Sequence, residues 1–146
     1  MKPVFLAFGP YRDPNPEVEK LRLRVYCLVD MELMRYGIHT ISPMPKFFYE
    51  GILSSDEFIR SWAVWTEYAK TLIEASSFMI AIRFPGWEKS EGLKGEIEIA
   101  KQLNKMICFL DFDSKYDSNE IRKKVTQIVG GNLFLNKSGL KKDEPI

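Results

Sequence analysis

Short apolar runs alternate with segments of helical periodicity along the chain. Runs rich in β-branched and aromatic residues predict strands, whereas apolar residues that recur every three or four positions predict helices. We expect five strands, at 4–8, 39–42, 78–84, 106–110 and 132–135. We expect four helices, at 16–36, from a cap at Ser54 or Ser55 through Leu72, at 91–104 and at 119–129. A long loop over 43–51 precedes the second helix.

Strands that alternate with helices are typical of an α/β protein whose parallel sheet is covered on both faces. The expected architecture is a flavodoxin-like or Rossmann-like, doubly wound, five-stranded parallel sheet of order 2-1-3-4-5. Its ligand site would lie beyond the carboxyl ends of strands one and three, which here end in the loops 9–15 and 85–90. We interpret residues 1–135 as one domain and residues 136–146 as a charged, flexible tail.

Composition and charge narrow the class of partner. The 146 residues include 21 Lys and Arg against 20 Asp and Glu, which gives a net charge of +1. This balance provides no broad field for a nucleic-acid polymer or an anionic membrane. No apolar run reaches the roughly 18 residues of a membrane span. A small polar molecule is therefore the expected partner.

The sequence offers little to hold a metal or a cofactor. The single histidine, His39, and the distant Cys27 and Cys108 do not have the spacing of a zinc site. The phosphate-binding loops GxxxxGK(S/T) and GxGxxG do not occur, so we expect neither a metal nor a cofactor. Both cysteines lie in apolar runs, which favours two buried thiols in a reducing cytoplasm over a disulfide.

The helix predicted at 91–104 carries two glutamates with different surroundings. Glu98 lines up with lysines at three- and four-residue steps, as on a solvated face, whereas Glu96 lines up with Ile99, Ala100 and Leu103. A carboxylate on an apolar face needs a reason. Two interpretations stay open from spacing alone: Glu96 serves a ligand, or it only offsets the helix dipole.

Three segments, taken together and in this order, resemble the nucleoside 2-deoxyribosyltransferase superfamily. They are Phe8-Gly9-Pro10-Tyr11, Ser42-Pro43 and Gly92-x-x-Gly95-Glu96-Ile97-x-x-Ala100. The resemblance covers about residues 3–112. It is closest to a small branch with a Pro-Gly-Trp loop before the glutamate helix, related to deoxynucleoside 5′-monophosphate N-glycosidases. It implies cleavage of the bond between a nucleobase and C1′ of a (deoxy)ribose through a covalent glycosyl-enzyme, followed by transfer or hydrolysis.

The resemblance also implies roles for individual residues. Glu96 would be the nucleophile that attacks C1′, and Tyr11 would orient Glu96 or contact the sugar, the other interpretation being a plain turn aromatic. Four residues would border the substrate, the glycines keeping the backbone bare so that a ligand can approach. These are Gly9, Pro10, Gly92 and Gly95.

Ser90 bears on the choice between nucleosides and nucleotides. Relatives that act on free nucleosides tend to have a carboxylate six residues before the nucleophile, which would repel a phosphate. Ser90, with Arg12 nearby in the first loop, therefore favours a 5′-monophosphate, although loop serines are common without any such role. Trp87 lies in the loop before Ser90 and is a candidate for stacking on the base.

One position departs from the family pattern. The aspartate that usually assists proton transfer to the base is replaced by Ala69, and the adjacent Glu67 and Tyr68 are expected to point to other faces. Trp62 and Trp65 could help to build an aromatic base pocket with Trp87, but core packing is the favoured interpretation for both. The departure keeps a second hypothesis open: a nucleotide-binding or sensing domain that has the pocket but little catalysis.

The resemblance finally predicts a homodimer or higher homo-oligomer. In this family a neighbouring subunit completes the site with residues just after the fourth strand, and Ser118 and Asn119 fall nearest that position. The alternative is that residues 117–119 simply cap the next helix. The aromatic loop 47–49 would form a lid or supply contact surface between subunits.

Overall fold

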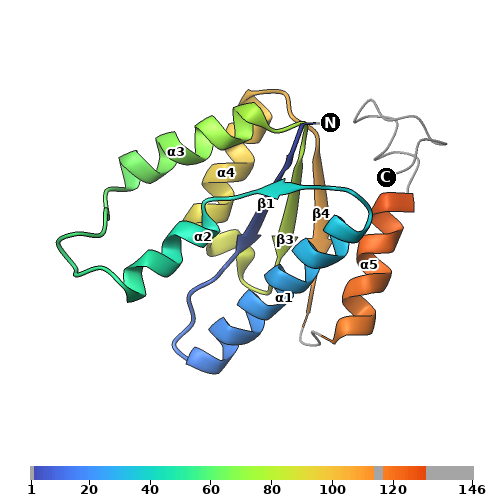
Figure 1. Cartoon of the computed structure of the whole chain (residues 1–146), viewed down its shortest axis with the longest axis horizontal. Coiled ribbons are helices and arrows are strands. Elements are labelled where there is room, and N and C mark those ends of the chain that lie inside the picture. The colour runs from blue at the N-terminus through green and yellow to red at the C-terminus, as the bar shows by residue number, and fades with distance from the viewer. Residues whose placement is uncertain (1, 114–116, 131–146) are drawn as a thin grey trace.

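The sheet is parallel and its strands have the order β2-β1-β3-β4. The computed structural model describes residues 2–113 and 117–130 (Figure 1). The strands are β1 (Val4–Gly9), β2 (Thr40–Ile41), β3 (Met79–Arg83) and β4 (Ile107–Asp111). The α/β class and the order of these four strands are confirmed. The fifth strand predicted at 132–135, and the tail at 136–146, lie outside the described residues.

Helices cover both faces of the sheet (Figure 1). They are α1 (Pro16–Arg35), α2 (Met44–Phe47), α3 (Trp62–Ala75), α4 (Glu91–Gln102) and α5 (Ser118–Gly130), with short 3₁₀ turns η1 (Phe48–Gly51) and η2 (Trp87–Lys89). Helix α1 packs against α5, and α3 packs against α4. Side chains of β1 alternate between the two layers: Val4 and Leu6 join the core with α1 and α5, Phe5 and Ala7 the core with α4.

Local signals explain the helices that the sequence predicts well. The Asn15 side chain accepts a hydrogen bond from the Glu17 N–H at 3.0 Å and caps α1. Pro16 occupies the first turn of the helix, where a missing N–H costs nothing. Gly37 follows the helix in a left-handed conformation with a φ of 76°.

The start of the second predicted helix is wrong. Helix α3 begins at Trp62, where the Ser61 side chain accepts the Val64 N–H at 3.4 Å. Ser54 instead closes a separate turn, because its hydroxyl donates to Asp56 at 2.7 Å and its carbonyl accepts from the Phe58 N–H at 3.1 Å. The residues expected to form one long loop contain α2 and η1.

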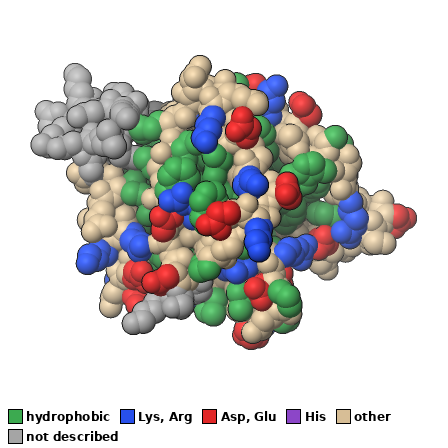
Figure 2. Space-filling model, turned by 180° about the vertical axis from the view of Figure 1, so that it is seen from behind, with side chains coloured by type: hydrophobic (Ala, Val, Ile, Leu, Met, Phe, Trp, Pro, Cys, Tyr) green, Lys and Arg blue, Asp and Glu red, His purple; other side chains and the backbone are tan. Residues whose placement is uncertain are grey.

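The surface is mixed in charge. Acidic and basic side chains lie among one another on the face seen in Figure 2. Cys27 and Cys108 are free thiols, but Cys27 is exposed, so the expectation that both are buried is wrong. Within residues 2–113 and 117–130 the structure contains no helix with the length and apolar character needed to cross a membrane.

Candidate active site

A cavity of about 220 Å³ lies at the carboxyl end of β2. Its wall combines hydroxyl groups, one carboxylate and apolar side chains from α1, β2, α2 and α3. The lining residues are Tyr26, Asp30, Thr40, Ile41, Ser42, Pro45, Tyr68 and Leu72. The volume is below the roughly 300–1,000 Å³ of pockets for drug-sized ligands. It suits a single heterocycle with polar edges better than a whole nucleotide.

Hydrogen bonds between polar side chains of this cavity hold them in place. Tyr26 shares a hydrogen bond with Ser42, and the Thr40 hydroxyl donates to the Asp30 carboxylate at 2.5 Å. Burial raises the pKa of Tyr26 to about 12. The Tyr26 phenol therefore keeps its proton at physiological pH. Neither Tyr26 nor Asp30 was predicted as a site residue, because both belong to the amphipathic pattern of α1.

Glu96 lies in the second turn of α4. Burial is the main cause that raises the pKa of Tyr26, and the negative charge of Glu96 adds a small further increase. As the spacing predicts, Glu98 is exposed whereas Glu96 is partly buried. Among the described residues no hydrogen bond or ion pair engages the Glu96 carboxyl. It is a partly buried acid without a partner among the described residues, which is typical of functional sites.

Burial raises the pKa of Glu96 to about 8. The dipole at the start of α4 therefore does not keep this carboxyl ionised. The dipole acts mainly over the first turn of a helix, and Glu96 lies six residues after the cap residue Ser90. The loss of solvation raises the pKa of Glu96 by more than the helix dipole lowers it. At pH 7 the protonated form therefore predominates.

Gly9 and Ser90 bring the end of β1 against the start of α4. A Cβ atom on Gly9 would lie 2.7 Å from the Ser90 Oγ and 2.8 Å from the Leu93 Cβ. The Ser90 side chain caps α4 by accepting the Leu93 N–H at 3.4 Å, so capping is one role of this serine. Pro10 follows Gly9 through a cis peptide bond. The predicted substrate contacts of Gly9, Pro10 and Ser90 stay predictions.

The two glycines of α4 differ in their surroundings. A Cβ on Gly92 would lie 3.7 Å from the Trp62 indole, whereas nothing lies within 4 Å of a Cβ on Gly95. Trp62 is 59% exposed. Its interpretation as a core residue is therefore wrong, which leaves the alternative of an aromatic pocket open. Trp65 instead stacks on Phe47 with ring centroids 4.6 Å apart.

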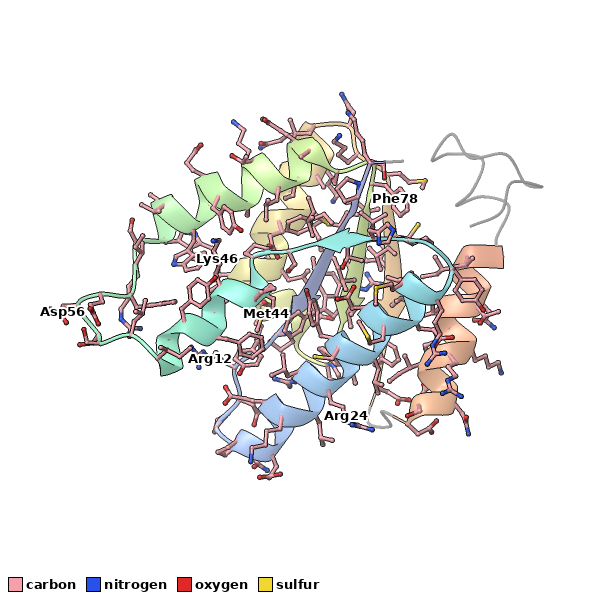
Figure 3. All side chains as sticks on the ribbon, viewed as in Figure 1. Arg12, Arg24, Met44, Lys46, Asp56 and Phe78 are labelled. Carbon is pink, nitrogen blue, oxygen red and sulfur yellow. The ribbon has the colours of Figure 1, made fainter. Side chains whose placement is uncertain are left out.

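The loop after β1 places Tyr11 against Phe8 and leaves Arg12 exposed beside Glu50. The Tyr11 ring meets Phe8 edge-on with a centroid distance of 6.0 Å. The Tyr11 hydroxyl bonds none of the described residues, so it does not orient Glu96 by a hydrogen bond. Arg12 pairs with Glu50 at 3.0 Å, and Arg60 reaches the other oxygen of that carboxylate at 3.0 Å. Figure 3 shows Arg12 beside the segment of α2 and η1. A phosphate would have to compete with Glu50.

Trp87 lies in the loop after β3, as predicted. It lines a second cavity, of about 590 Å³, at the carboxyl ends of β3 and β4. There the Arg83 guanidinium lies 4.8 Å from the Trp87 ring centroid and donates to Asp111 at 2.8 Å. Stacking of Trp87 on a base bound beside Tyr26 receives no support from this arrangement.

Ser118 and Asn119 are not in the cavity of their own chain. They open α5, where the Asp117 side chain accepts the Glu120 N–H at 2.8 Å. The capping interpretation thus holds for Asp117. A contribution of Ser118 and Asn119 to a neighbouring subunit's site stays a prediction.

Tyr68 lines the cavity, although the sequence pattern predicts that it points away from the site. Leu72, one turn later on α3, lines the cavity as well, whereas Ala69 is buried. Across the described ranges, no three His, Cys, Asp or Glu side chains gather in a way that could hold a metal ion.

The parallel sheet, its helices on both faces and the cavity at the carboxyl end of β2 define a Rossmann-like α/β protein. The chain belongs to the family described as "Domain of unknown function (DUF1937)", whose model matches residues 4–111. The matched range contains Gly9, Tyr11 and Glu96 and ends before Ser118. No curated protein matches the chain.

Proposed function

We propose that this chain is a cytoplasmic enzyme of nucleotide metabolism that cleaves or transfers the N-glycosidic bond of (deoxy)nucleosides or their 5′-monophosphates. The proposal rests on the resemblance to nucleoside 2-deoxyribosyltransferases. It also retains the predicted five-stranded order, in which residues 132–135 would be the fifth strand. Glu96 attacks C1′ and the base leaves. A second base or water then takes the sugar from Glu96.

The observation that carries the proposal is the environment of Glu96. A carboxyl group that is partly buried, unpaired within the described residues and raised in pKa to about 8 is costly to keep. Its charge acts on Tyr26, and the Tyr26 side chain lines the polar cavity at the carboxyl end of β2. Partial exposure leaves the carboxyl accessible to C1′ of a sugar whose base occupies the cavity.

A substrate panel tests this proposal. Purified protein is incubated with ribo- and deoxyribonucleosides and their 5′-monophosphates, with and without a second base, and released base is measured by chromatography. We expect release with at least one substrate, complete loss in Glu96→Ala and near wild-type rates in Glu98→Ala. Equal losses in both variants, or no release by the wild-type protein, would overturn the proposal.

The second candidate function is a nucleotide-binding or sensing domain of the same fold. Two observations favour it: Glu96 is mostly protonated at neutral pH, and Ala69 provides no acid for the base. In that case the same panel raises the melting temperature of the protein without releasing base.

A further inference from the structure

A departing nucleobase needs a proton donor on the side of the bond opposite the nucleophile. Glu96 cannot attack C1′ and protonate the base in the same step. The cavity presents two phenols, from Tyr26 and Tyr68. The Tyr26 hydroxyl is engaged with Ser42, whereas the Tyr68 hydroxyl has no hydrogen-bond partner in the described part of the chain. Of these two donors, only Tyr68 is free for a ligand.

The ring of Tyr68 is held in place by its neighbours. The Lys46 ammonium lies 5.2 Å from its centroid, and the Trp65 ring meets it at a centroid distance of 6.1 Å and an angle of 63°. Figure 3 shows Lys46 rising from α2 toward α3. Cation–π and edge-to-face contacts of this kind fix a ring without using its hydroxyl.

Lys46 also adds positive charge at this wall. Its ammonium lies between the rings of Tyr49 and Tyr68, at 5.7 and 5.2 Å, and no carboxylate of the described residues pairs with it. Negative charge develops on a base as its bond to C1′ breaks. An unpaired cation beside the donor stabilises that charge.

We propose that Tyr68 is the catalytic proton donor to the leaving base, an assignment that rests on the proposed glycosidic function. The C1′–N bond breaks and its electron pair goes to the base, which takes the Tyr68 proton at a ring nitrogen or carbonyl oxygen. Glu96 forms the new bond to C1′. In hydrolysis, water then attacks C1′, the electron pair of the C1′–O bond returns to Glu96, and the proton of the water restores the Tyr68 phenol.

The experiment compares Tyr68→Phe on two substrates that differ in their need for a proton. One is a purine nucleoside, and the other is its N7-methylated counterpart, whose cationic base leaves as a neutral molecule. Sugar and 5′ group match those that the wild-type protein cleaves best. For a pyrimidine-specific protein, uracil and 5-fluorouracil nucleosides form the pair. We expect kcat/KM to fall about 10²-fold or more on the ordinary base and under about threefold on the activated one.

The control is Tyr49→Phe, which removes a hydroxyl from the other ring against Lys46 and should leave both rates unchanged. Retained activity on the activated substrate shows that Tyr68→Phe is folded. Equal losses on both substrates, or no loss on either, overturn the assignment of Tyr68 while the glycosidic function stands. A wild-type protein that cleaves neither substrate overturns both.

Discussion

Gly9 and Ser90 lie so close together that a Cβ atom at position 9 would come within 2.7 Å of the Ser90 Oγ. The contact joins the end of β1 to the cap of α4, the helix that carries Glu96. The position of the candidate nucleophile therefore depends on Gly9, although the local backbone conformation does not require a glycine there.

Gly9→Ala should destabilise the protein and reduce its activity. The added methyl group meets the Leu93 Cβ at 2.8 Å as well as Ser90, so α4 must shift. We expect a loss of about 1–3 kcal/mol in the free energy of unfolding, measured by urea denaturation. Gly95→Ala is the matched control: its Cβ meets open space, and the change should stabilise the free protein by about 0.5–1 kcal/mol. A higher KM in Gly95→Ala would support ligand approach at this backbone.

The rate of base release should rise with pH. The attacking form of Glu96 is the carboxylate, and its pKa lies near 8. We expect kcat/KM to increase toward about tenfold per pH unit below pH 8 and to level off above it. Glu98→Ala should keep this profile. A flat profile between pH 6 and pH 9 would contradict the role of Glu96.

Stability should change with pH in the opposite direction. The Glu96 carboxyl has a pKa of about 8 in the folded protein and about 4.3 in an unfolded chain. The folded state binds more protons across this window, so the free energy of unfolding falls as pH rises from 5 to 8.5. Glu96→Gln should remove roughly 1–3 kcal/mol of that fall. In Glu98→Gln the fall should equal that of the wild type.

The 5′ group of the substrate should be selected by Ser90 and Arg12. We expect monophosphates to exceed nucleosides in kcat/KM and Ser90→Asp to reverse the order, since aspartate still caps α4 but repels phosphate. Because Glu50 occupies Arg12 at 3.0 Å, Glu50→Gln should increase the preference for monophosphates about two- to fivefold. A wild-type preference for free nucleosides would refute this selection.

The protein should form a two-fold symmetric homodimer or higher homo-oligomer that shares its sites. Light scattering at micromolar concentration measures the mass against the 17.0 kDa chain. Glu96→Gln should have low activity when assayed alone, and so should the double variant Ser118→Ala, Asn119→Ala. Mixed after dissociation, they should recover about a quarter of wild-type activity, since half the dimers are mixed and each has one intact site. A fully active monomer would rule out sharing.

The sequence predicts those parts of the fold that local signals decide. Asn15, Pro16 and Gly37 mark the ends of α1, and the apolar runs mark β1 and β3. The start of α3 was missed because Ser54 and Ser61 are equivalent as caps, and the choice depends on tertiary contacts. One of these is the hydrogen bond from the Trp65 indole to the Ile59 carbonyl at 2.6 Å.

The site was predicted only in part for a similar reason. The buried face of α4 singles out Glu96, because periodicity alone separates it from Glu98. Tyr26 and Tyr68 belong to the apolar patterns of their helices, and nothing in those patterns indicates that the two phenols meet at one cavity. Their meeting follows from the path of the chain after β2.

Strand β2 pairs with β1 only at Val4 and Phe5, and the chain then turns into α2. On the β2 side of β1, the described chain has no strand beside residues 6–9. This gap in the sheet edge lets side chains from the helix layers on the two faces of the sheet meet. Two further residues in β2 would extend the sheet edge by roughly 7 Å and close it. The size of this cavity is thus set by the length of one edge strand, so a change of strand length would alter the space available without replacing any residue of the wall.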